Sequence, residues 1–457
     1  MNRPRTTSWV KLLAGTAALT LTLAACGSTE DPEATDTPTN SESADESPSE
    51  AESSAAEETF TVEKCTNETS ADSFRVGGIL PLTGNLAFLG PPEIAGVGLA
   101  VSDINAAGGV GGAMSCQDIQ DSGDSTDLSV STASAGALVA SEPSVVIGAA
   151  SSSVSLNVVD TFADNKIVEI SPANTAADLS GYSPYYFRTA PEDSVQGGVL
   201  GSLVSQDGYQ KMAFLVFNDT YGTGLRNFTQ TAFEGAGGEC VYGCKGDGDE
   251  FPAGQTTFSS EVTAALASNP DAIVVLAFDE TKAIVPELAS QGWDMSTTYY
   301  TDGNTSDYSA DLEPGTLEGA QGTIPGADPD QTVKDRLNEY SVQAEGEELT
   351  SYSYGAESYD AVILAALAAV KGGDTTSETV QKNFAAVSGA TGGDECMTFS
   401  DCVALLEEGN EIFYKGPSGI GPINDLNDPS SAFVGVYQFD GDNKVALTST
   451  LEASSEN

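Results

Sequence analysis

The chain has 457 residues, with 68 Asp and Glu side chains against 17 Lys and Arg, no histidine, and a formal net charge of −51. So acidic a protein is not expected to bind nucleic acid, because phosphate recognition needs a basic surface. The lack of histidine excludes the Ser-His-Asp and Cys-His schemes of hydrolysis, so we expect no catalytic residues and no enzyme activity.

Residues 1–25 have the features of an export signal. Arg3, Arg5 and Lys11 precede an apolar run that is too short to span a bilayer and ends in Leu-Ala-Ala-Cys-Gly. This ending resembles the bacterial lipobox, in which small residues admit the signal peptidase and the cysteine is acylated. We therefore expect cleavage before Cys26 and lipid on Cys26 that anchors the chain to the outer face of the cell membrane. An ordinary signal peptide that happens to precede a cysteine is the alternative.

Residues 26–73 are expected to form a disordered acidic tether that follows the lipidated cysteine. From Gly27 to Glu63 the chain is mostly Ser, Thr, Glu, Asp, Pro and Ala, with 12 acidic residues and no basic one. Such a composition buries too little apolar surface to offset the entropy of ordering, and its like charges repel one another.

Six cysteines follow Cys26, and an even number outside the cytoplasm indicates disulfides. Spacing favours Cys240–Cys244 and Cys396–Cys402 as local loops, which leaves Cys65 to pair with Cys116. A metal site is the rival interpretation, but the chain has no histidine and no second cysteine pair at zinc spacing. The glycine-rich run at 108–112 lacks the spacing of a dinucleotide site, so we expect neither a metal nor a cofactor.

The body alternates short apolar strands with helices. Strands are predicted at 75–80, 144–148, 167–170, 212–217, 272–277 and 297–301, and helices at 153–164, 222–234 and 281–291. Ile94, Val97, Val101 and Ile104 follow helical spacing, and Gly108-Gly109 ends that helix. Repeated strand–helix units predict an α/β fold with doubly wound parallel sheets, in which ligands bind at the carboxyl ends of the strands.

Several short segments, in order along the chain, resemble the branched-chain amino acid binding proteins of ABC transporters. They are Gly78–Gly90, Asp103–Gly109, Val146–Gly148 with Ser151–Ser153, Ile170–Thr175, Tyr186–Arg188, Asp219–Gly222, Asn269–Val274 and Tyr359–Ala361. The resemblance spans residue 74 to about 371 and implies a type I periplasmic-binding fold, in which two lobes joined by a three-segment hinge close on a ligand. It places the first lobe at 74–191 with 324–431 and the second at 192–323 with 432–457.

The resemblance also implies a ligand site at the edge of the first lobe. Ser152 and Ser153 follow a strand and open a helix, where hydroxyls and free backbone N–H groups suit a carboxylate. The alternative for these serines is a simple helix cap. Ala173 and Thr175 follow the next strand and match positions that hold the amino-acid head group, so Ser152 and Thr175 are the best pair for the α-carboxylate.

The second lobe is expected to supply an acid and aromatic walls. Asp302 ends a strand at the position where the family pairs with the ligand's α-ammonium, although an Asp-Gly turn is a serious alternative. Tyr221 and Phe278 fall where the family has aromatic contacts. Leu89 stands where branched-chain binders can show an aromatic residue, and this departure leaves the side-chain specificity open.

The expected function is an extracytoplasmic receptor of an ABC importer, with permease and ATPase subunits as partners and a small amino acid as ligand. A ligand sensor on the same fold is the alternative output. The same family also binds amides, urea and small aromatic acids.

Overall fold

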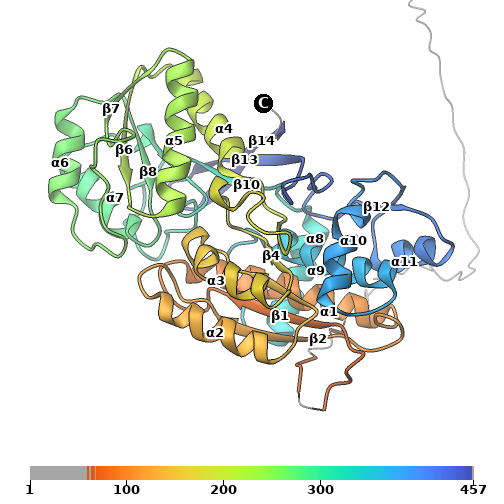
Figure 1. Cartoon of the computed structure of the whole chain (residues 1–457). Coiled ribbons are helices and arrows are strands. Elements are labelled where there is room, and N and C mark those ends of the chain that lie inside the picture. The colour runs from red at the N-terminus through yellow and green to blue at the C-terminus, as the bar shows by residue number, and fades with distance from the viewer. Residues whose placement is uncertain (1–58, 61–62, 67, 455–457) are drawn as a thin grey trace, which may run out of the picture. The chain divides into compact units, whose positions relative to one another are not determined.

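The computed structural model describes residues 59–60, 63–66 and 68–454. The predicted signal sequence, Cys26 and most of the predicted tether lie outside the described residues. The body contains two large β-sheets with helices packed on both faces of each (Figure 1). Among the helices that the structure describes, none combines the length and the apolar character needed to cross a bilayer.

The first sheet is parallel throughout and runs in the order β2-β1-β3-β4-β5. Its elements are β1 (Arg75–Leu80), α1 (Gly90–Ala106), β2 (Cys116–Asp121), α2 (Leu128–Ala140), β3 (Val145–Gly148), α3 (Ser152–Asp164), β4 (Glu169–Ser171) and β5 (Tyr186–Arg188). In β3, Val145 and Ile147 face the core with α1, whereas Val146 faces the core with α2 and α3. Because alternate side chains of the strand pack into cores on opposite faces of the sheet, the whole strand is apolar, as the sequence pattern predicts.

The second sheet runs in the order β14-β13-β10-β9-β8-β6-β7. Its elements are α4 (Asp193–Gln206), β6 (Lys211–Val216), α5 (Thr220–Gly235), β7 (Glu239–Tyr242), α6 (Ser259–Ala267), β8 (Ala272–Leu276), α7 (Thr281–Ser290), β9 (Thr298–Tyr300), β10 (Gln321–Pro325), β13 (Ser431–Phe439) and β14 (Val445–Ser454). The prediction of parallel sheets needs a correction here, because β13 pairs antiparallel with both β10 and β14. The turn between β13 and β14 is too short for the crossover that parallel strands require.

The remaining elements return to the first sheet. They are α8 (Gln331–Ala344), α9 (Gly355–Gly372), α10 (Ser377–Val387), β11 (Asp394–Cys396), α11 (Phe399–Glu407) and β12 (Ile412–Tyr414). Helix α9 packs on α1 and on β3 and β4, so the chain passes between the two sheets three times. Two of these passages are joined by a buried ion pair, in which Arg188 Nε lies 2.7 Å from Asp428 Oδ1.

Three disulfides are present, with the pairings that the sequence predicts: Cys65–Cys116, Cys240–Cys244 and Cys396–Cys402. The first one holds the segment before β1 against β2, where the Cys65 N–H also donates to the Gln117 carbonyl at 2.9 Å. Phe60 lies within the predicted tether, yet its ring is buried 5.7 Å from that of Tyr340. The described residues at the end of the predicted tether are therefore attached to the body.

Candidate functional site

A small cavity lies between the carboxyl ends of strands from the two sheets, with about 260 Å³ of empty space, part of it open to solvent. Its lining residues are Leu86, Leu89, Ala150, Ser151, Ser152, Ala173, Asn174, Thr175, Tyr221, Phe278, Asp302, Gly303 and Tyr354. Seven of the eight residues predicted for the ligand site are in this set.

One wall of the cavity is the buried carboxyl of Asp302, which follows β9 and is 7% exposed. Its Oδ1 accepts a hydrogen bond of 2.6 Å from the Tyr221 hydroxyl, and its Oδ2 accepts one of 2.7 Å from the Tyr354 hydroxyl. Burial raises the pKa of Asp302, although these two hydrogen bonds oppose the shift. No lysine or arginine lines the cavity, so a cationic group of a ligand is the natural partner of this acid.

The facing wall consists of hydroxyl groups at the start of α3. Ser151 is the N-cap residue of this helix, but its side chain makes no capping hydrogen bond and its Oγ has no partner among the described residues. Ser152 Oγ accepts from the Ala176 N–H at 3.2 Å, which leaves its own hydroxyl proton free to donate. Burial raises the pKa of the neighbouring Asp193 carboxyl, and the Thr175 hydroxyl beside it opposes that shift. Ser151 and Ser152 at the helix N-terminus, together with the Thr175 hydroxyl that follows β4, form a cluster suited to a carboxylate.

Ser153 differs from the prediction, because it does not line the cavity. Its Oγ accepts from the Thr220 N–H at 3.4 Å, at the start of α5. Successive residues in the first turn of a helix point in different directions around its axis, so Ser152 and Ser153 cannot both face the cavity. Ser153 instead connects the two helix N-termini that face one another across the cleft.

The apolar part of the wall is aromatic on one side and aliphatic on the other. The rings of Tyr221 and Phe278 are stacked, with centroids 5.6 Å apart and an interplanar angle of 15°. Leu86, Leu89 and Ala173 come from the first sheet's side and are buried. A ligand with an apolar side chain would meet carbon atoms on both sides.

Several lining residues were not predicted, and Tyr354 is the most consequential of them. It is the N-cap residue of α9 and has a left-handed backbone with φ of 62°, which is uncommon for a non-glycine residue. Its hydroxyl joins α9, which packs on the first sheet, to Asp302 of the second sheet. The one sequence signal is the Tyr-Gly pair directly before a long apolar helix. Leu86, Ala150, Ser151, Asn174 and Gly303 were also missed.

The family comparison gives a match over most of the chain. A family model described as periplasmic binding protein matches residues 73–400. A leucine-, isoleucine-, valine-, threonine- and alanine-binding protein of Pseudomonas aeruginosa is 31% identical over 172 residues, which cover 37% of this chain and 45% of that protein. The chain thus spans about half the length of that relative. The chemotactic signal transduction substrate-binding protein of Halobacterium salinarum is 25% identical over 75% of this chain and 82% of its own length.

Solved structures share the fold. The isoleucine complex of a branched-chain amino acid transporter substrate-binding protein from Streptococcus pneumoniae has a TM-score of 0.67 at 21% identity, covering 84% of this chain and 99% of that one. A solute-binding protein of an ABC transporter from R. palustris, in complex with 4-hydroxybenzoate, also has a TM-score of 0.67, at 16% identity, covering 84% of this chain and 98% of that one. At these identities the likeness concerns the type I fold and leaves the ligand open.

Proposed function

The chain belongs to the periplasmic binding protein family, and on that premise we propose that it is the extracytoplasmic solute-binding receptor of an ABC importer. Its ligand is a small zwitterionic amino acid with a branched or other neutral side chain, which closure removes from water. The observation that carries the proposal is the cavity itself, with a buried acid on one wall and a hydroxyl cluster on the other. An α-ammonium and an α-carboxylate would satisfy these two walls at once.

Binding would work by closure and would involve no chemical step. The first lobe comprises residues 74–191 with 324–431, and the second comprises 192–323 with 432–457. The three passages between them form the hinge. Because the cavity has one wall from each lobe, a ligand that contacts both walls favours the closed form. The closed receptor then delivers its ligand to the permease, whose ATPase subunits drive transport.

The lipid anchor at Cys26 completes the proposal. Acylation there would keep the receptor at the outer face of the membrane, and the acidic segment after it would let the body reach the permease. Fatty-acid labelling of the chain in its host should be lost in Cys26→Ser. Labelling that persists in this variant would exclude Cys26 as the anchor.

The central test is a ligand screen by calorimetry and thermal shift. Leu, Ile, Val and other neutral amino acids should stabilise the protein, whereas 4-methyl-2-oxopentanoate, which lacks the ammonium of leucine, should not. Asp302→Ala should abolish this binding while the fold is retained, as measured by circular dichroism. If none of the neutral amino acids stabilises the protein, the assigned specificity is wrong.

A sensor is the second candidate, because the Halobacterium relative that aligns over 75% of this chain is described as part of a chemotactic system. Amides, urea and small aromatic acids are the alternative ligands on the same fold. A benzoate would leave Asp302 without a cationic partner, so we expect benzoate and urea to fail in the same screen. Permease and ATPase genes next to this gene would favour transport over sensing.

A further inference from the structure

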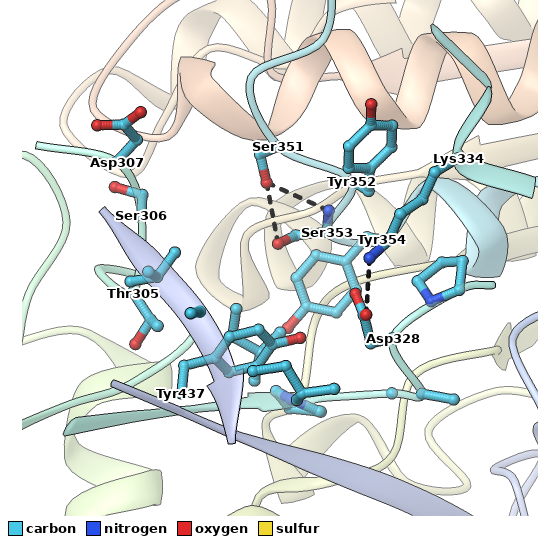
Figure 2. A pocket seen from close by; sticks show the side chains of 18 of the residues that line it. Thr305, Ser306, Asp307, Asp328, Lys334, Ser351, Tyr352, Ser353, Tyr354 and Tyr437 are labelled. Atoms are coloured by element: carbon cyan, nitrogen blue, oxygen red, sulfur yellow. Dashed lines mark hydrogen bonds and ion pairs between the residues drawn. The ribbon is translucent and has the colours of Figure 1, made fainter. Parts of the chain in front are cut away.

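A second cavity lies beside the candidate site and encloses about 1,020 Å³, part of it open to solvent (Figure 2). Its walls come from both sheets and from the segment that leads from β10 back to the first sheet. The loop after β9, strand β14 and Tyr437 of β13 contribute from the second sheet, and residues 350–354 with Glu357 contribute from the start of α9. Tyr354 lines both cavities, so one ring separates this space from the candidate site.

Glu357 is the buried charge of this cavity. It is 3% exposed and lies in the first turn of α9. Apart from its own backbone N–H, its carboxyl has no hydrogen-bond donor and forms no ion pair in the part of the chain that the structure describes. A Cβ on Gly326 would collide with Oε1 of Glu357, so the left-handed glycine at φ of 105° makes room for the carboxyl at the cavity wall.

Among the described residues, the surroundings of Glu357 supply no cation that is free to pair with it. Glu93 of α1 is fully buried, neither of its oxygens has a partner among the described residues, and the charge of Glu357 acts on it. The cavity wall also carries Asp307 and Asp328, and its single cation, Lys334, is already paired with Asp328 at 2.6 Å. Burial raises the pKa of Glu357 well above its usual value, so the ionised form of this acid calls for a further cation beside it.

The protein itself shows how an ammonium is held here. Lys334 Nζ lies on the Asp328 carboxylate and 5.7 Å from the centre of the Tyr352 ring, which is within cation–π range. Figure 2 shows Tyr354 and Tyr437 projecting into the same cavity. Both tyrosines lie close enough to Glu357 for its charge to act on them. Glu357, Tyr354 and Tyr437 thus bring an acid and two aromatic rings to the wall of one cavity, the same kinds of group that hold Lys334.

From this arrangement we propose that the second cavity binds a small organic cation, a primary amine with an apolar stem, on the carboxyl of Glu357. The stem would lie against Ile324, Val445 and Leu447, which complete the lining. Because the cavity has walls from both sheets, a bound amine contacts both and favours the same closed form as the main ligand. The site is distinct from Asp302, so the proposal stands whether or not an amino acid binds there.

The test is titration calorimetry of the full-length protein with n-butylamine. The amine should bind, and 1-butanol, which has the same stem without the charge, should not. Glu357→Gln keeps the size of the side chain and should weaken butylamine binding about tenfold or more, because a hydrogen bond to a charged group is lost.

The matched control is Asp307→Asn, which removes one negative charge from an exposed residue at the rim of the same cavity. It should change butylamine affinity by less than about twofold, because exposed charges are screened. Tyr437→Leu is a second variant, which removes a partly exposed ring and should weaken binding about threefold or more.

The proposal is overturned if butylamine does not bind, if 1-butanol binds as tightly, or if Glu357→Gln and Tyr437→Leu both bind butylamine like the unaltered protein. The proposal is also overturned if Asp307→Asn and Glu357→Gln weaken butylamine binding equally. The amine would then be held only by the general negative charge of the protein.

Discussion

The hydroxyl of Tyr354 donates a 2.7 Å hydrogen bond to Oδ2 of Asp302, although the two residues belong to halves of the fold with separate β-sheets. Tyr354 precedes a helix packed on the first sheet, and Asp302 ends a strand of the second. Both side chains are buried. A hydrogen bond between parts that separate on hinge opening exists only in the closed form, so it should help to determine how readily the protein closes.

Tyr354→Phe should therefore weaken ligand binding. The change removes one donor to a buried acid, and hydrogen bonds to charged groups contribute about 1.5–3 kcal/mol, so we expect a loss of affinity of roughly tenfold or more. Calorimetry with the ligand identified by the screen measures it. Tyr352→Phe is the matched control, since Tyr352 makes a cation–π contact with Lys334 through its ring, which phenylalanine keeps. Equal affinities in the two variants would contradict a closing role for Tyr354.

As the pH is lowered, ligand affinity should begin to fall at a higher pH than it would if Asp302 had the pKa of an ordinary aspartate. Burial raises the pKa of Asp302 in the ligand-free protein, and an α-ammonium needs the ionised form. Protons therefore compete with the ligand as the pH falls through this raised pKa, and affinity is constant above it. The neighbouring Asp193 is also buried, and the charge of Asp302 adds to the burial that raises its pKa.

Calorimetric titrations between pH 5 and 8 measure this effect. In Asp302→Asn the affinity should be low at every pH, and the pH dependence should be reduced to whatever Asp193 contributes. A profile for the unaltered protein that stays flat down to pH 5, as it would with an ordinary aspartate, would contradict a raised pKa of Asp302 as the cause.

Glu93 should make the protein less stable as the pH rises. Burial raises its pKa well above the ordinary value, and the charge of Glu357 adds to the shift. The folded protein then holds a proton that the unfolded chain releases, so this stabilising contribution is complete below the ordinary glutamate pKa and is lost as the pH rises through the raised one.

Glu93→Gln should flatten this dependence by up to about 1.4 kcal/mol per pH unit within that window. Urea unfolding at several pH values from 4 to 8 gives the slope. Glu339→Gln, on the exposed face of α8, is the control and should leave the slope unchanged. A Glu93→Gln variant with the slope of the unaltered protein would mean that Glu93 is not the titrating group.

The sequence predicted those site residues that come soon after a strand in the chain. Ser152, Thr175 and Asp302 each come just after or near the carboxyl end of a buried strand, and such ends meet at one edge of a sheet. The apolar strands themselves were clear because both faces of each sheet are covered. Their predicted bounds differ from the observed ones by at most two residues, and those of β1 agree.

Tyr354 could not be predicted in the same way. It comes from an irregular segment before α9, and it meets Asp302 only because the chain returns to the first sheet. Its left-handed backbone is set by tertiary packing and is not a preference of tyrosine. The hairpin of β13 and β14 was missed for a related reason, because strand direction depends on a turn geometry that apolar runs do not encode.

The Cys65–Cys116 disulfide should contribute more to stability than Cys240–Cys244. The sequence separations are 51 and 4, and in the chain-entropy account a longer closed loop restricts the unfolded chain more. Replacing both cysteines by serine should cost about 4 kcal/mol for Cys65–Cys116 and about 2 kcal/mol for Cys240–Cys244. Chemical denaturation of the two double variants measures the difference. Equal losses would show that strain or residual structure in the unfolded chain, and not loop length, determines what these crosslinks contribute.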